Sequence, residues 1–148
     1  MSEKIKYEGY MAKQIRVFLD NKPGRLEKVT GVLAAKGVNV RAMLISDRGE
    51  FGIVKFLVDK PDLTIVVLKD AGFAAAVKEV VAVRLDDKIG RLHDMIEFLS
   101  SRGINISDGY GFAGHSVFCL ETEGFEEAAR LLKENGFYVL SDQELYET

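Results

Sequence analysis

A seven-residue turn occurs twice in this chain of 148 residues. The stretch DNKPGRL begins at Asp20 and DDKIGRL begins at Asp86, 66 residues later, and five of the seven positions are identical. At the same spacing, GVNV from Gly37 corresponds to GINI from Gly103. The repeat predicts that the chain consists of two copies of one structural unit in tandem.

Between the turn and the later glycine, each copy has apolar residues at i, i+3 and i+7, the spacing of one face of an amphipathic helix. The glycine itself can adopt the left-handed conformation that ends a helix. The apolar residues are Leu26, Val29 and Leu33 in copy one and Leu92, Met95 and Leu99 in copy two. β-Branched runs, IRVFL and VAVRL before the turns and VNVRAMLIS and INISDGY after the glycines, predict strands on both sides of this helix.

Each copy continues with a hairpin signal, DRGEFG or FAGH, and a further strand, IVKFLV or SVFCLE. Alternation places Val54, Phe56 and Val58 on one face of the first of these strands, matched by Phe118 and Leu120 in the second. FEEAARLLKENGF is typical of a helix with a glycine cap and the start of a strand. Its counterpart PDLTIVVLKDAGF is ambiguous alone, but the repeat predicts a helix with Pro61 in its first turn.

Each copy therefore has the order strand–helix–strand–strand–helix–strand, which is that of the ferredoxin-like fold, with both helices on one face of an antiparallel sheet. The predicted fold class is α+β. The run AAAVKEVVAVRL leads directly from the last strand of copy one into the first strand of copy two. We predict an N-terminal tail at residues 1–11 and two tandem βαββαβ units at residues 12–77 and 78–148, packed against each other as a pseudo-dimer.

The formal net charge of −3 disfavours nucleic acid as a partner, because the chain has no cationic surplus to displace counterions from phosphates. The single cysteine, Cys119, excludes an intrachain disulfide and fits a reducing compartment. The N-terminal stretch lacks the apolar region of a signal peptide, and no apolar run has the length of a membrane span. These features predict a cytoplasmic protein with no membrane partner.

The repeated turn has the chemistry of a small-molecule site. The first N–H groups of a helix lack intrahelical partners and, together with the helix dipole, favour an anion. Gly24 and Gly90 let a ligand approach the backbone closely. The acidic and amide side chains just before each glycine can accept hydrogen bonds from an ammonium group, so the turn suits a zwitterion such as a free amino acid. The same residue types also form ordinary caps and turns, and this alternative stays open.

The stretch DNKPGRLEKVTGVLAAKGVNV resembles the signature of the ACT domain, a regulatory small-molecule-binding module of amino-acid metabolism. With SDRGEFGIVKFLVDKPD and LKDAGF, residues 12–142 resemble the stand-alone proteins that consist of two ACT domains. The resemblance implies that amino acids bind between paired ACT domains, where the turn of one domain faces the second strand of its neighbour.

The resemblance also implies which residues bind the ligand. In copy one they are Asp20, Asn21, Lys22, Pro23, Gly24, Arg25, Leu26, Met43, Leu44 and Ile45, and in copy two they are Asp87, Lys88, Ile89, Gly90, Arg91, Leu92, Gly109, Tyr110, Gly111 and Phe112. Copy two departs from the motif, since Ile89 replaces proline and Asp87 replaces asparagine. The carboxylate of Asp87 would repel a ligand carboxylate, so the second site is expected to be lost or to differ in specificity.

Other motifs carry less weight. The glycines from Gly109 to Gly114 spell G-x-G-x-x-G, but the strand expected after them disfavours a dinucleotide fingerprint, which must open a helix. His93 and His115 form no recognisable metal set, and Cys119 has no base at a diagnostic spacing. No cofactor or metal is therefore expected. The mixed charges of the C-terminal SDQELYET are expected to be solvated surface.

We predict a non-enzymatic regulatory protein that binds a free amino acid, forms a homodimer and acts as a sensor or allosteric regulator of an enzyme of amino-acid metabolism in trans. One alternative is a structural dimerisation module without a ligand. Another is a small ferredoxin-like enzyme, for which we find no nucleophile with an orienting base. An RNA-binding domain is disfavoured, because Phe18, Ile53 and Leu57 on the open sheet face suit a protein interface better than base stacking.

Overall fold

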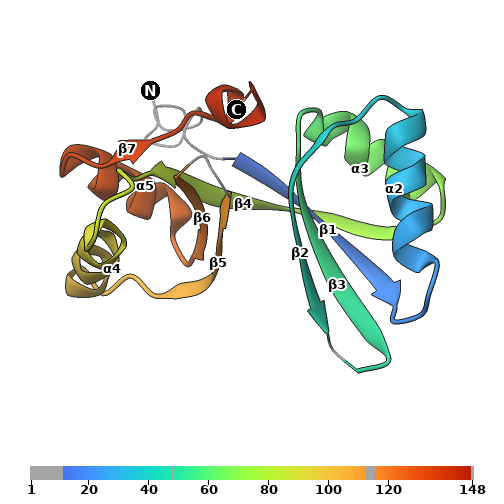
Figure 1. Ribbon diagram of the computed structural model, residues 1–148, viewed down its shortest axis with the longest axis horizontal. Coiled ribbons are helices and arrows are strands. Elements are labelled where there is room, and N and C mark those ends of the chain that lie inside the picture. Colours follow the sequence, from blue (N-terminus) through green and yellow to red (C-terminus); the bar gives the residue numbers. More distant parts are fainter. Residues whose placement is uncertain (1–11, 48, 113–115, 148) are drawn as a thin grey trace. The chain divides into compact units, whose positions relative to one another are not determined.

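The computed structural model describes residues 12–47, 49–112 and 116–147. The chain divides into two compact units, Lys13–Lys78 and the segment from Glu79 onward, which we call the first and second modules. In each module two helices lie on one face of a sheet (Figure 1). The α+β class and the two ferredoxin-like βαββαβ units predicted from the repeat are therefore confirmed.

The first module has the strand order β2-β3-β1-β4. Its elements are β1 (Ala12–Asp20), α2 (Arg25–Ala35), β2 (Val40–Asp47), β3 (Phe51–Val58), α3 (Pro61–Asp70) and β4 (Ala74–Arg84). The helix predicted over the ambiguous segment is α3, and Pro61 occupies its first turn as expected. Strand β4 continues across the boundary between the modules, as the missing linker predicted, and its last part is the first strand of the second module.

The second module has the strand order β7-β4-β6-β5. After β4 its elements are α4 (Arg91–Ser101), β5 (Ile106–Phe112), β6 (Val117–Thr122), α5 (Phe125–Glu134), β7 (Tyr138–Val139) and α6 (Asp142–Glu147). Helix α4 begins and ends 66 residues after α2, and α5 begins and ends 64 residues after α3. The hairpin that connects β5 to β6 falls largely on residues 113–115, outside the described part of the chain.

Each module has its own apolar core. In the first, Ile15 and Val17 of β1 pack with Val29 and Leu33 of α2 and with Phe56 of β3, and all five are buried. The second has the same arrangement, with β4 residues packed against the helix residues Met95, Leu99 and Leu132. The apolar helix stripe thus lies over the sheet as its spacing predicted, except at its first position. Leu26 is only half-buried and Leu92 is 42% exposed, so this position is left for another role.

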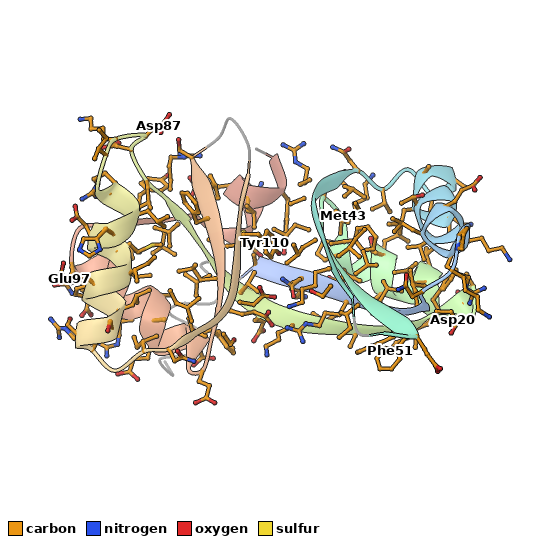
Figure 2. All side chains as sticks on the ribbon, turned by 60° about the horizontal axis from the view of Figure 1, so that its bottom comes forward. Asp20, Met43, Phe51, Asp87, Glu97 and Tyr110 are labelled. Carbon is orange, nitrogen blue, oxygen red and sulfur yellow. The ribbon has the colours of Figure 1, made fainter. Side chains whose placement is uncertain are left out.

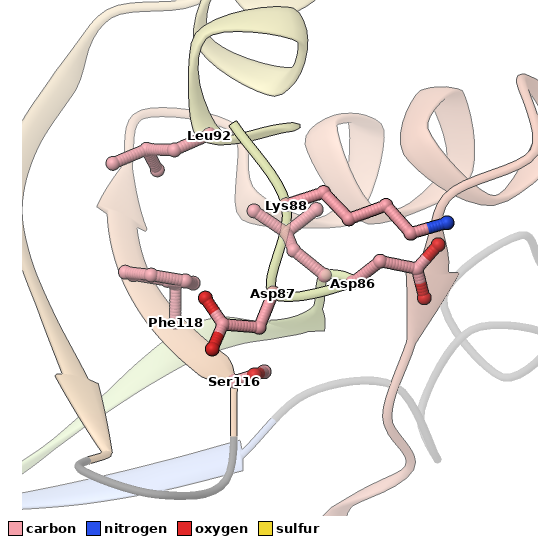
Figure 3. Close-up of a pocket in the computed structure, with 7 residues that line it drawn as sticks. Asp86, Asp87, Lys88, Leu92, Ser116 and Phe118 are labelled. Carbon is pink, nitrogen blue, oxygen red and sulfur yellow. The ribbon is translucent and has the colours of Figure 1, made fainter. Parts of the chain in front are cut away.

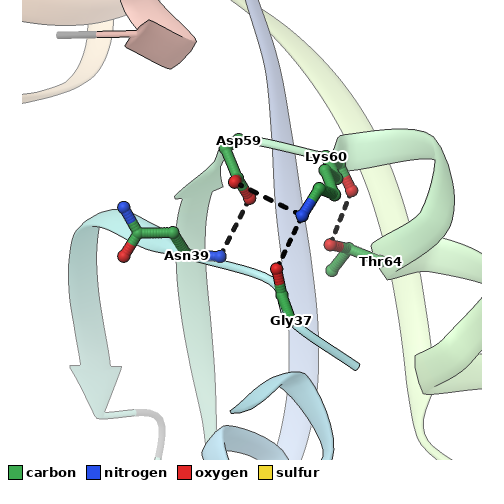
Figure 4. A network of polar contacts seen from close by, with 5 residues as sticks. All are labelled: Gly37, Asn39, Asp59, Lys60 and Thr64. Atoms are coloured by element: carbon green, nitrogen blue, oxygen red, sulfur yellow. Dashed lines mark hydrogen bonds and ion pairs between the residues drawn. The ribbon is translucent and has the colours of Figure 1, made fainter. Parts of the chain in front are cut away.

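Glycines with a left-handed backbone end the first helix of both modules, at Gly37 (φ 71°) and Gly103 (φ 72°). In the first module a polar network also holds this helix end (Figure 4). The Lys60 ammonium donates to the Gly37 carbonyl at 2.7 Å, and the Asn39 N–H donates to the Asp59 carboxylate at 2.8 Å. In the second module Gly124 stands at the position equivalent to Lys60. The two modules therefore share a backbone but differ in the polar contacts that support it.

The segment SDQELYET, whose charges are predicted to be solvated surface, also contains helix α6 and a buried leucine, Leu145. The Ser141 hydroxyl accepts from the Glu144 N–H and the Glu144 carboxylate accepts from the Ser141 N–H, both at 3.1 Å, which is a reciprocal capping box. The Tyr138 hydroxyl also donates to Glu144. This bond, followed by the one from Ser141, lowers the pKa of Glu144, so these contacts stabilise the folded module at neutral pH and are lost as the pH falls through the lowered pKa. Leu145 is completely buried.

We expect Leu145→Ala to reduce the free energy of unfolding of the second module by about 2–5 kcal/mol, because it removes a buried side chain and leaves a cavity. The conservative Leu145→Met keeps the volume and should cost less than about 1.5 kcal/mol. Urea unfolding of both variants measures the difference. Equal stability of the alanine variant and the unsubstituted protein would show that α6 contributes nothing to the core.

Candidate ligand-binding turns

In each module the repeated turn leads from a strand into the first helix through a glycine. Gly24 has a φ of 87° and Gly90 a φ of 90°, and no side chain caps either helix. The first N–H with a backbone partner at helical spacing is that of Lys28, which donates to the Gly24 carbonyl at 3.1 Å, and the corresponding donor in the second module is Asp94. Ordinary side-chain capping by the preceding Asp and Asn residues is therefore wrong as an explanation of this turn.

Asn21 connects the first turn to the hairpin between β2 and β3. Its N–H donates to the Glu50 carbonyl at 2.9 Å and its side-chain Nδ2 donates to the Gly49 carbonyl at 3.1 Å. Asp20 lies at the end of β1, opposite Phe51 at the start of β3 (Figure 2). The turn is thus held against the neighbouring hairpin, and the predicted ligand contact of Asn21 would share the side chain with a structural role.

Arg25 brings a cation to the first turn. Its Nη2 lies 3.9 Å from the Asp20 Oδ2, a long and half-exposed ion pair of little energetic value. Its Nε is buried and has no hydrogen-bond partner among the described residues. A buried N–H donor without an acceptor is unfavourable, so a carboxylate bound here would satisfy it.

A cavity adjoins the repeated turn in each module. The first has a volume of about 140 Å³ and is lined by Leu19, Asp20, Asn21, Lys22, Arg25, Leu26, Ile45, Gly52 and Val54. The second has a volume of about 300 Å³ and is lined by Leu85, Asp86, Asp87, Lys88, Leu92, Ser116 and Phe118 (Figure 3).

The two cavities occupy equivalent places in the two modules. All seven residues that line the second correspond to residues that line the first, with a spacing of 66 at the turn and helix and of 64 on the later strand. The equivalent pairs are Leu19 and Leu85, Asp20 and Asp86, Asn21 and Asp87, Lys22 and Lys88, Leu26 and Leu92, Gly52 and Ser116, and Val54 and Phe118. Leu26 and Leu92, the first positions of the two apolar helix stripes, are cavity walls.

The predicted second-strand residues only partly join the cavities. Met43 and Ile45 of β2 lie opposite Phe56 and Val54 and so on the helix side of the sheet, where Ile45 lines the first cavity, whereas Leu44 lies on the other face. Their counterparts on β5 are Gly109, Gly111 and Tyr110. Phe112 ends β5, but its side chain lies outside the described part of the structure. Of the turn residues, five line neither of these two cavities: Pro23, Gly24, Ile89, Gly90 and Arg91.

Sequence reasoning missed the cavity walls that come from strands. Leu19 and Leu85 end or follow the first strand of each module, and Val54 and Phe118 lie on the later one. The alternation of apolar residues predicted that these side chains face the helices, but it gives no signal that they border an open space. The repeat could have found them as a set, since both copies use the same positions.

The structure describes Cys119 and His93, two of the remaining candidate residues. Burial raises the pKa of the Cys119 thiol to about 12, so this group is not a nucleophile at neutral pH. His93 lies on exposed helix α4 at 3.1 Å from Glu97, and His115 lies outside the described residues. In the part of the chain that the structure describes, no cluster of His, Cys, Asp and Glu could hold a metal ion. No helix in the same part has the length and hydropathy required to cross a membrane.

The G-x-G-x-x-G segment, which starts at Gly109, begins in strand β5. Gly109 and Gly111 pair with Leu120 and Phe118 of β6 within an antiparallel ladder. The next described element after β5 is strand β6, not a helix. The segment therefore lacks the strand–turn–helix context of a dinucleotide site.

Comparison with known proteins agrees with this architecture. A protein from Bacteroides thetaiotaomicron (BT0572) has a crystal structure with a TM-score of 0.89 and 34% sequence identity, over 94% of this chain and 98% of that one. The regulatory subunits of aspartate kinase from Thermus thermophilus and Thermus flavus share the fold, with TM-scores of 0.61 and 0.57 and identities of 20% and 18%. The alignments cover 84% and 82% of this chain and 92% and 90% of those subunits.

No functionally curated protein matches the chain in sequence. The sequence profile of the ACT domain pair matches residues 10–148, which is nearly the whole chain. This match agrees with the resemblance seen at the repeated turn and with the two ferredoxin-like modules. The chain belongs to the ACT domain pair family.

Proposed function

We propose that this ACT domain pair is a regulatory protein that binds a free α-amino acid at the repeated turns without transforming it. Binding of the amino acid then regulates an enzyme of amino-acid metabolism allosterically. The observation that carries the proposal is the pair of equivalent cavities at turns whose helices have no capping side chain. Helix N–H donors and charged side chains lie next to apolar walls in both, which is the combination that an amino acid requires.

The first module offers the better carboxylate site. Arg25 lines its cavity with an unpartnered Nε, and Lys22 is a second cation in the lining. The carboxylate of Asp20 lies in the same lining and can accept from an ammonium group. Both charges of an amino acid thus meet an opposite charge, while Leu26, Ile45 and the neighbouring strand residues supply an apolar surface for its side chain.

A regulatory rather than a catalytic role fits the chemistry of the described residues and the proteins that share the fold. Two structurally similar proteins are regulatory subunits of aspartate kinase, which gives a precedent for a module of this kind acting on an enzyme. We extend that precedent to this chain as a hypothesis, since the similarity to those subunits is one of fold.

We expect one or more of the twenty amino acids to raise the melting temperature. A ligand with so few heavy atoms binds with modest affinity, at micromolar concentration or weaker. At about 100 times Kd the folded state gains roughly 2.7 kcal/mol per site, which corresponds to about 5–10 °C for a chain of this length. Thermal-shift screening at millimolar concentration measures the effect. If no amino acid moves the melting curve, the protein is a structural module instead of a sensor.

Arg25→Gln is a sharper test of the site than a change at Gly24. Gly24 needs its positive φ whether or not a ligand is bound, so a bulky substitution there would strain the backbone. The glutamine variant keeps the helix and removes the cation, and we expect it to abolish most of the thermal shift while leaving the unliganded melting temperature nearly unchanged, because the Asp20 ion pair is weak.

The two turns should be unequal. Asn21→Asp adds a negative charge and removes the donor to the Gly49 carbonyl, so we expect it to weaken amino-acid binding more than Asp87→Ala does. Calorimetric titration of the two variants and of the unsubstituted protein gives the dissociation constants. Two identical sites, or the opposite order of effects, would contradict this expectation.

We propose further that the chains form a homodimer. Phe18 and Phe51 are 44% and 50% exposed and lie on the sheet face opposite the helices, near half-buried Ile53. Leu57, which was expected on the same exposed surface, is completely buried and does not belong to it. We expect Phe18→Lys to shift sedimentation toward the monomer, whereas Leu63→Lys on exposed α3 should not. A native protein that sediments as a monomer at micromolar concentration would refute the pairing.

A further inference from the structure

The two cavities differ in charge although their turns are nearly identical in sequence. Arg25 and Arg91 are equivalent residues, yet Arg25 lines the first cavity and Arg91 does not line the second. Arg91 turns away: its Nη1 lies 3.3 Å from the Asp94 carboxylate and its guanidinium lies 5.5 Å from the centre of the Phe137 ring. The second cavity therefore lacks the arginine of the first: its charged lining residues are Asp86, Asp87 and Lys88, whereas those of the first cavity are Asp20, Lys22 and Arg25.

One substitution between the copies explains the different direction of the two arginines. The residue three positions after Arg91 is Asp94, which attracts the guanidinium as an i, i+3 partner. The equivalent residue in the first module is Lys28, which repels Arg25. Arg25 is left beside Asp20 at the cavity, whereas Arg91 is held on the surface of α4.

The second cavity has a carboxylate where the first has an amide. Figure 3 shows the Asp87 carboxylate on the same side as Leu92 and Phe118 and close to Ser116, whereas Asp86 and Lys88 point to the other side of the turn. The Asp87 carboxylate forms no hydrogen bond or ion pair with the described residues. It is an exposed acceptor without a protein partner among the described residues, at the wall of a cavity of about 300 Å³.

The remaining walls also suit a cation. Phe118 replaces Val54 and brings an aromatic ring, whose face attracts an ammonium group. On the edge strand, Gly111 stands in the place of Ile45. A Cβ on Gly111 would lie 3.2 Å from the Phe118 ring, so the ring packs directly over the glycine and no branched side chain occupies this part of the cavity. The second cavity is larger, at about 300 Å³ against about 140 Å³, and the Asp87 carboxylate lies on the same side of the turn as its aromatic ring, Phe118.

We propose that the second cavity selects organic cations, primary ammonium groups with an apolar substituent, through Asp87 and Phe118, while the first selects carboxylates through Arg25. Asp87 is the residue that sets this specificity. The inference rests on the proposed ligand-binding role of the two turns. It assigns them different ligand classes and does not require both charges of an amino acid to be present in one ligand.

The test uses two probes that each carry one charge of the same skeleton. 3-Methylbutylammonium is leucine without its carboxylate, and 4-methylpentanoate is leucine without its ammonium group. Each is titrated into the full-length ¹⁵N-labelled protein at constant ionic strength, because salt screens exposed charges. We expect the ammonium probe to shift the amide signals of Asp87, Lys88 and Ser116, and the carboxylate probe to shift those of Lys22 and Arg25.

Asp87→Asn gives the second turn the amide that Asn21 provides in the first. We expect it to weaken binding of the ammonium probe about three- to fivefold, the upper part of the range for an exposed ion pair. Glu123→Gln is the control, since it removes an equal charge from an exposed residue of the second module that does not line this cavity, and it should change the dissociation constant less than twofold. Unchanged binding by the Asp87 variant, or preference of the second cavity for the carboxylate probe, would overturn the inference.

The outcomes also separate this inference from the proposed function. If no amino acid stabilises the protein but the ammonium probe shifts the second turn in an Asp87-dependent manner, the amino-acid sensor fails and the cation site stands. If an amino acid stabilises the protein through Arg25 and the ammonium probe shifts nothing in the second module, the sensor stands and the cation site fails.

Discussion

The first helix of each module begins at a glycine in the left-handed region, and this backbone constraint shapes both candidate sites. Because the glycine occupies the capping position, no side chain of the turn bonds to the first N–H groups of the helix. The side chains of the turn, which could otherwise cap the helix, make other contacts. Asn21 bonds to the neighbouring hairpin, and Asp87 faces the second cavity. A single backbone conformation thus leaves helix donors and side-chain acceptors available on one side of the turn.

The sequence predicted this backbone well because the same pattern of apolar residues and glycines occurs in both copies. Helical spacing identified the buried residues Val29, Leu33, Met95 and Leu99, and the second copy resolved the segment that became α3. The repeat could not predict α6, which has no counterpart in the first copy. Its signal was a capping box from Ser141 to Glu144 around one buried leucine, in a stretch whose charged residues suggested only surface.

The cavities were less accessible to sequence reasoning for two physical reasons. Their walls include strand residues such as Val54 and Phe118, whose alternation indicates burial but not the presence of an open space beside them. The direction of a long side chain depends on a neighbour one helical turn away, so the identical residues Arg25 and Arg91 serve different purposes. The difference between Lys28 and Asp94 accounts for the two directions, but this effect could be recognised only from the ion pairs of both arginines in the structure.

Discrimination between ligands at such exposed turns depends on rejection as much as on attraction. An ion pair at a solvent-exposed site contributes little affinity, since water competes for both partners. The same carboxylate of Asp87 that attracts an ammonium group also repels a carboxylate, and the difference between the two ligands includes both terms. In the first cavity Arg25 reverses the sign of this difference, while the smaller volume beside Ile45 limits the size of the ligand. On the proposed assignment, one duplicated backbone would acquire two sites with opposite preferences through changes at four positions: the equivalents of Asp87, Asp94, Gly111 and Phe118.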